Sequence, residues 1–90
     1  MSLSEDAKTK LLQIAKCSIE HEFREQEPLQ VHLENFAPEL RKPGACFVTL
    51  RIHGQLRGCI GSLQAKLSLV ADVADNAHEA AFGDPRFTQL

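Results

Sequence analysis

The sequence predicts an α+β fold in which two helices pack against an antiparallel β-hairpin. Three observations lead to this prediction: a helical repeat of apolar residues near the N-terminus, a β-branched and aromatic run in the middle, and a helical stripe of small residues near the C-terminus. The chain has 90 residues, of which 43% are hydrophobic and 24% are charged. This length and balance are typical of a single small globular unit with a thin core, so residues 1–90 are treated as one domain.

The first helix is expected from about Ser4 to Phe23. Ser2 and Glu5 have the spacing of a capping box, and Ser4 is an equally good N-cap. Apolar residues then recur at spacings of three and four, which predicts one buried face. That face is formed by Leu12, Ala15, Ile19 and Phe23, and it is widened by Leu11 and Ile14.

Residues 25–44 are expected to connect this helix to the hairpin. Three prolines, Pro28, Pro38 and Pro43, interrupt regular structure there, and Gly44 ends the segment. The segment is too apolar for a free linker, so we expect it to lie over the core. A short helical turn is expected near Pro38.

The hairpin is expected from two strands, residues 45–52 and 55–61, joined at His53-Gly54. A two-residue loop would mix arginine with aliphatic residues on both faces. A three-residue loop from Ile52 to Gly54 separates them, because a shift of one residue exchanges the faces of a strand. One face then holds Cys46, Val48, Leu50, Leu56, Gly58 and Ile60, and the other holds Phe47, Thr49, Arg51, Gln55, Arg57 and Cys59. The three-residue loop is therefore predicted, with Gly54 at the position that needs positive φ.

The second helix is expected from about Ser68 to Phe82. Ser68 can cap its start, and Gly83 followed by Pro85 suits its end. Its apolar stripe consists of Val70, Val73, Ala74, Ala77 and Ala81. Because small residues allow another element to come close, we expect this helix to lie flat on the hairpin.

The charge distribution argues against nucleic-acid binding. The formal net charge is −2, whereas DNA and RNA binders usually carry a surplus of cations. Residues 28–66 alone are positive, at +3, and contain Arg51 and Arg57. Tryptophan and tyrosine are absent, so aromatic platforms for stacking bases are scarce.

Three cysteines, Cys17, Cys46 and Cys59, indicate reduced thiols and hence a cytoplasmic protein, because an odd count is a poor disulfide framework. No apolar run reaches the roughly 18–20 residues that cross a bilayer, and the N-terminus does not resemble a secretory signal. Cys46 and Cys59 lie on opposite faces in the predicted register. They therefore predict neither a disulfide nor a zinc site, and no cofactor is expected.

The second strand carries the strongest chemical signal. Gly58 and Gly61 flank Cys59 and Ile60, and glycines in strands mark bulges or close backbone approaches. Arg57 is expected on the same face as Cys59, where a guanidinium favours the reactive thiolate. The alternative is that Cys59 is a small packing residue, as many free cysteines are. Cys17 and Cys46 are expected to pack.

These motifs resemble the AMME chromosomal-region domain family. The run Phe47–Leu50, the hairpin and the sequence LRGCIG at residues 56–61 are similar to one characteristic stretch of that family. Asn76-Ala77, residues 80–82 and Asp84-Pro85-Arg86-Phe87 are similar to a second stretch. Family domains are about twice as long, so this chain resembles their N-terminal half and is expected to be an incomplete domain.

The resemblance implies an α+β fold, an unassigned biochemical activity and a bacterial or archaeal origin of the AmmeMemoRadiSam type. It also implies a modification pathway with Memo-type and radical SAM proteins as partners. Cys59 is then the candidate nucleophile. The candidate binding residues are Thr49, Arg57, Gly58, Gly61, Asp84 and Arg86.

Alternatives remain for several of these residues. Asp84 and Arg86 can form an ion pair that fixes the exit of the second helix. Cysteine catalysis needs a base within reach, and the candidates are His53 at the hairpin tip and His78 on the flank of the second helix. A non-catalytic binding or scaffold module could instead use the glycine-rich hairpin as a groove for a partner. An unpaired sheet edge also predicts self-association of the chain.

Overall fold

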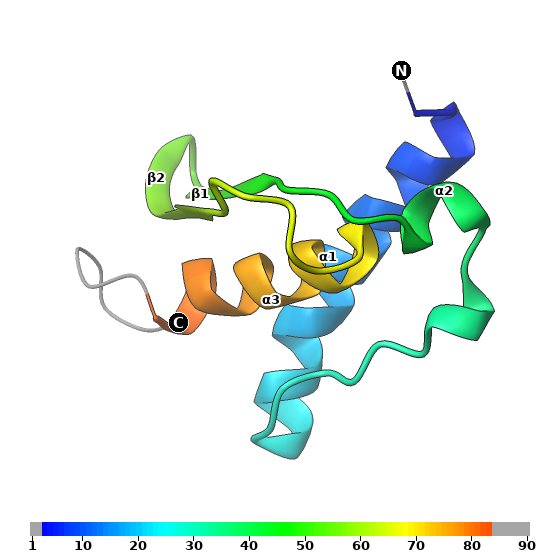
Figure 1. Cartoon of the computed structure of the whole chain (residues 1–90). Helices are drawn as coiled ribbons and strands as arrows, with labels where there is room; N and C mark the ends of the chain where they lie inside the picture. Colours follow the sequence, from blue (N-terminus) through cyan, green and yellow to red (C-terminus); the bar gives the residue numbers. More distant parts are fainter. Residues whose placement is uncertain (1–2, 84–90) are drawn as a thin grey trace.

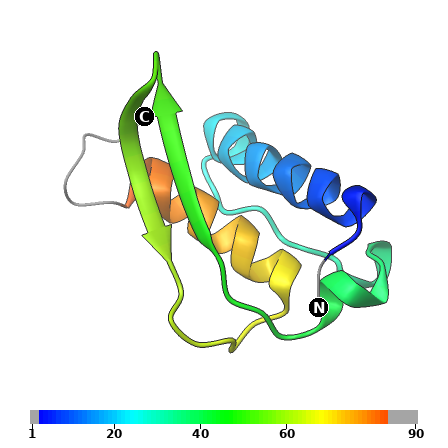
Figure 2. The ribbon, with the colours of Figure 1, turned by 90° about the horizontal axis from the view of Figure 1, so that it is seen from above.

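The computed structural model describes residues 3–83. It contains two long helices, one β-hairpin and two short helical turns (Figure 1). In chain order the elements are α1 (Glu5–Glu25), a 3-10 turn η1 (Leu33–Asn35), α2 (Pro38–Arg41), β1 (Phe47–Ile52), β2 (Gln55–Gly61) and α3 (Leu69–Phe82). Helix α3 lies between α1 and the hairpin (Figure 2). The predicted α+β class is confirmed.

Helix α1 begins where Ser4 accepts a hydrogen bond on Oγ from the Ala7 backbone N–H, at 3.1 Å. The face predicted to be buried is partly wrong, because Leu12 is 67% exposed and Phe23 is 57% exposed. The helix is rotated so that Ser18 faces α3 and donates from Oγ to the Ala74 carbonyl at 2.7 Å. This contact requires a small side chain and turns Leu12 away from the core.

The connecting residues lie over the core, as expected. Leu40, in the predicted turn that forms α2, is 1% exposed and packs with Ala7 and Val70. Backbone hydrogen bonds then tie residues 42–44 to residues 67–69, so both ends of the hairpin unit are held together (Figure 1).

Helix α3 follows the prediction closely. Its predicted apolar stripe is buried throughout, and Ala80 joins it. Ser68 is the N-cap by position, although its side chain makes no capping hydrogen bond. Gly83 is the C-cap, and its N–H donates to the Glu79 carbonyl.

The predicted three-residue loop of the hairpin is wrong. Ile52 pairs with Gln55, so the loop has two residues, and both His53 and Gly54 have positive φ (53° and 79°), as a type I′ turn requires. Arg51 pairs with Leu56 and Leu50 pairs with Gly58, so Arg57 is the extra residue of a β-bulge. The bulge restores the separation of faces in the body of the strands that the short loop alone would lose.

None of the helices among residues 3–83 is long and apolar enough to cross a membrane.

Candidate functional site

The inner face of the hairpin is closed by α3. Gly58 is buried, and a Cβ there would overlap the backbone oxygen and carbonyl carbon of Ala80. Val48, Leu50 and Ile60 share this face by strand alternation and are half-buried. Gly58 therefore serves a backbone-to-backbone contact with α3.

The outer face of the hairpin carries the candidate thiol. Thr49 is paired with Cys59 across the strands, and Thr49 Oγ1 lies 3.5 Å from Cys59 Sγ, within hydrogen-bonding distance for sulfur. Phe47 is 65% exposed and lies over Gly61, where a Cβ would overlap its ring. We use "outer face" for these four residues, which alternation directs away from α3.

Arg57 is the extra residue of the bulge and is half-buried. It lies two positions before Cys59 on β2, at the point where the strand bends. The structure therefore brings Thr49 and Cys59 together, and it places Arg57 next to them along the chain. Asp84 and Arg86 lie outside the described residues.

The three thiols have different environments. Cys46 is half-buried, and burial raises the pKa of its thiol to about 11, while a hydrogen bond from Asn76 acts in the opposite direction. Cys17 is exposed on α1, so the expectation that it packs is wrong. The rotation of α1 that buries Ser18 leaves Cys17 outside. Cys59 is half-buried on the outer face.

A buried polar latch, which the sequence analysis missed, joins the base of the hairpin to α3. It consists of Cys46, Ser62, Asp72 and Asn76. Asp72 is 3% exposed and accepts from the Cys46 N–H at 2.9 Å and the Ser62 hydroxyl at 2.7 Å. Asn76 is 4% exposed and donates to Asp72 and to the Cys46 carbonyl. The signal for it was an Asp and an Asn four residues apart, beside a buried stripe.

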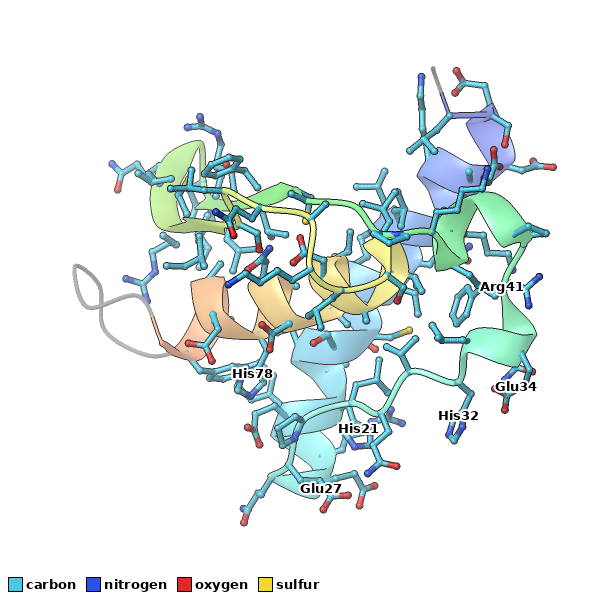
Figure 3. All side chains as sticks on the ribbon, in the orientation of Figure 1. His21, Glu27, His32, Glu34, Arg41 and His78 are labelled. Carbon is cyan, nitrogen blue, oxygen red and sulfur yellow. The ribbon has the colours of Figure 1, made fainter. Side chains whose placement is uncertain are left out.

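The histidines do not supply a base for Cys59 in the contacts that the structure gives. His78 Nε2 lies 2.7 Å from Glu22 Oε1, so His78 faces α1 and not the hairpin (Figure 3). His53 forms the turn at the hairpin tip. His21 and His32 lie near Glu27 and Glu34 in the lower part of Figure 3.

The arrangement does not favour a metal centre. Cys46 meets Asn76 of α3 on the inner side of the hairpin, while Cys59 meets Thr49 on the outer face. Within the described part of the chain, no three His, Cys, Asp or Glu side chains are placed to hold an ion together. What the outer face offers chemically is a thiol, a hydroxyl and a neighbouring guanidinium.

Comparison with known proteins identifies relatives among archaea. The chain is 41% identical over 85 residues to a protein of Saccharolobus islandicus, covering 89% of this chain and 36% of that protein. It is 39% identical to a Saccharolobus solfataricus protein (98% and 40%) and 36% identical to one from Methanothermobacter thermautotrophicus (94% and 44%). The chain therefore spans about two-fifths of the length of these relatives.

A solved structure has the same fold. The crystal structure of an uncharacterized protein from Pyrococcus horikoshii matches with a TM-score of 0.81 and 29% identity, covering 90% of this chain and 42% of that one. The AMMECR1 family model matches residues 12–90, which include the hairpin, the latch and α3. The chain belongs to the AMMECR1 family.

Proposed function

We propose that the outer face of the hairpin is a ligand-binding site in which Arg57 attracts an anionic group and the Cys59 thiol contacts the bound molecule. The site would act in a modification pathway with Memo-type and radical SAM proteins, as the family resemblance implies. The observation that carries the proposal is the Thr49–Cys59 pair, whose atoms lie 3.5 Å apart on a face that α3 leaves open.

The other two thiols provide a contrast that supports this choice. Cys46 is held in the latch with its pKa raised to about 11, and Cys17 stands on a helix flank. Cys59 alone has both a hydroxyl partner and an arginine two residues away in the strand. A nucleophilic role would in addition need a base near the sulfur, whereas His78 Nε2 lies within hydrogen-bonding distance of Glu22 on α1.

Alkylation with two reagents tests the proposal. Iodoacetate is an anion and iodoacetamide is neutral, so their rate ratio at each cysteine, measured by peptide mass spectrometry, reports local attraction of anions. We expect Cys59 to react faster than Cys17 and to show an iodoacetate preference about threefold larger. Arg57→Gln should remove that preference, whereas Arg51→Gln, an exposed arginine on the partner strand, should keep it.

The proposal fails if Cys59 reacts no faster than Cys17 with either reagent. It also fails if the iodoacetate preference at Cys59 equals that at Cys17, since Arg57 then exerts no attraction at the thiol.

A second function, a non-catalytic binding module, is favoured by one observation. Phe47 is a large aromatic side chain at 65% exposure beside Cys59, and aromatic residues are common anchors in protein interfaces. The spaces over Gly58 and Gly61 are filled by Ala80 and Phe47, so a partner would contact the outer face itself. A partner protein captured in a pull-down and lost in Phe47→Ala, with unchanged alkylation at Cys59, would favour this function.

A further inference from the structure

The C-terminal parts of α1 and α3 enclose a pocket of about 550 Å³. Glu22 and Phe23 of α1 form one side, and His78, Glu79 and Phe82 of α3 form the other. This volume is typical of sites for small molecules. None of the outer-face residues lines this pocket, so we treat it as a separate site and call it the helix-end pocket.

The polar side of the helix-end pocket is built around His78, whose side chain is 17% exposed. His78 Nε2 lies 2.7 Å from Glu22 Oε1. Because a carboxylate only accepts hydrogen bonds, Nε2 carries the hydrogen of this pair, and Nδ1 of the neutral ring is then an acceptor. Nδ1 lies 3.8 Å from Glu79 Oε1, which is a second acceptor. Two acceptors this close together favour a ligand that carries several N–H donors.

The position of the Glu79 carboxylate depends on Gly83, the C-cap of α3. A Cβ at Gly83 would overlap Glu79 Oε2. Glycine therefore leaves room for the carboxylate to fold back over the end of the helix, where it lies close to His78. The pairing of Glu79 with His78 in one pocket thus requires a glycine at this cap.

The electrostatics of the helix-end pocket favour a cation. Glu22 and Glu79 line it, and neither lysine nor arginine is among its described lining residues. Arg24, in the last turn of α1, is exposed and does not line the pocket. Both helices also end here, so the backbone carbonyls at two helix C-termini add partial negative charge.

The apolar side of the pocket is an aromatic pair. The rings of Phe23 and Phe82 meet edge to face, with centroids 5.3 Å apart. Phe23 is 57% exposed, so its ring surface is accessible to a ligand. Aromatic rings pack against alkyl chains and attract a cation placed over their faces. A metal ion would not use these rings, and the described residues offer no three ligands for one. An organic cation fits both sides of the pocket.

We propose that the helix-end pocket binds a primary alkylammonium group, which can belong to a free amine or to a lysine side chain. The ammonium donates to the Glu79 carboxylate and to His78 Nδ1, and the alkyl chain lies against Phe23 and Phe82. Glu22 is a positioning residue, because its bond to Nε2 leaves Nδ1 as the acceptor. A quaternary ammonium has no N–H donor, so it should bind more weakly.

A titration of the isotopically labelled chain with n-butylammonium, followed by NMR, tests the proposal. It is run at about pH 8, where histidine is ordinarily neutral. We expect saturable shifts of the backbone amides in residues 22–26 and 78–83, with a Kd of about 1 mM. The neutral analogue n-butanol should bind at least about tenfold more weakly, and tetramethylammonium about threefold more weakly. Putrescine and Nα-acetyl-lysine methylamide distinguish the two sources of the ammonium, since the tighter binder identifies the source.

Variants at exposed positions keep the fold and separate the contributions. Glu79→Gln retains the shape of the side chain but removes its charge, and it should weaken n-butylammonium binding about fivefold or more. Phe23→Leu should weaken binding about threefold. Gly83→Ala displaces the Glu79 carboxylate and should also weaken binding. The matched control is Glu25→Gln, which removes the same charge at an exposed position of α1 that does not line the pocket; binding should change by less than about 1.5-fold.

Three results would overturn the proposal: no saturable shift below about 50 mM amine, shifts confined to residues outside the two segments, or equal weakening by Glu79→Gln and Glu25→Gln. Binding of n-butanol as tight as that of n-butylammonium would also overturn it, because the pocket would then recognise the alkyl chain alone.

Discussion

The two faces of the hairpin are formed by alternate residues of the same strands, but the inner face packs against α3 and the outer face carries the candidate thiol. On the inner face, Gly58 packs against the backbone of Ala80, and the latch fixes the base of the hairpin through Asp72. On the outer face, Thr49 and Cys59 contact each other in partial exposure to solvent. Alternation along a strand separates stability from candidate chemistry here by a single residue. The two can therefore be disturbed independently.

The largest expected effect is from Gly58→Val. A Cβ at this position would overlap Ala80 backbone atoms, which cannot swing aside as a side chain can. The hairpin must then separate from α3, and we expect the free energy of unfolding to fall by about 3 kcal/mol or more. Urea denaturation followed by circular dichroism measures it. Thr49→Val on the outer face is the control, with a change within about 0.5 kcal/mol; equal losses in both variants would contradict the division between the faces.

A smaller loss is expected from Asp72→Ala. Its carboxylate accepts from Cys46, Ser62 and Asn76, and these donors would be left in a mostly buried site. The expected loss in the free energy of unfolding is about 2 kcal/mol, again measured by urea denaturation. Asp75→Ala, at an exposed position of the same helix, should stay within about 0.5 kcal/mol. Similar values for the two aspartates would mean that the latch contributes nothing.

The smallest effect concerns pH. Burial raises the pKa of the Cys46 thiol from 9.0 to about 11. Between these values the unfolded chain has lost the thiol proton while the folded chain retains it, so stability falls as pH rises from about 9 to 11 and is unaffected by this group below 9. The urea midpoint should decrease over this range, and less so in Cys46→Ala. An equal decrease in both proteins would exclude Cys46 as a cause.

The element boundaries and the α3 stripe could be predicted from the sequence because each depends on local pattern. Residues 55–61 form β2 as predicted, and the α3 stripe is buried. The placement of Thr49 and Cys59 on one face also followed from alternation, although their direct pairing across the strands was not predicted.

The remaining features depend on contacts between distant residues. The orientation of α1 is set by the Ser18–Ala74 contact, which no periodicity of apolar residues reveals. The latch joins residues 26 positions apart, Cys46 and Asp72, and could not be inferred from a strand or helix taken alone. The loop prediction failed because it compared loop lengths alone, whereas the hairpin combines a two-residue turn with a bulge at Arg57.

The bulge at Arg57 shifts the pairing register of the hairpin by one residue. The two residue pairs next to the turn follow one register, and the four pairs beyond the bulge follow another, offset by one residue. The tip and the body are therefore geometrically uncoupled: the turn can keep its tight two-residue form while Cys59 still points outward and Gly58 inward. Arg57 is the residue at which the two registers join. If the loop at the tip gained or lost a residue, the pairing at Arg57 would have to change for Cys59 to stay on the outer face.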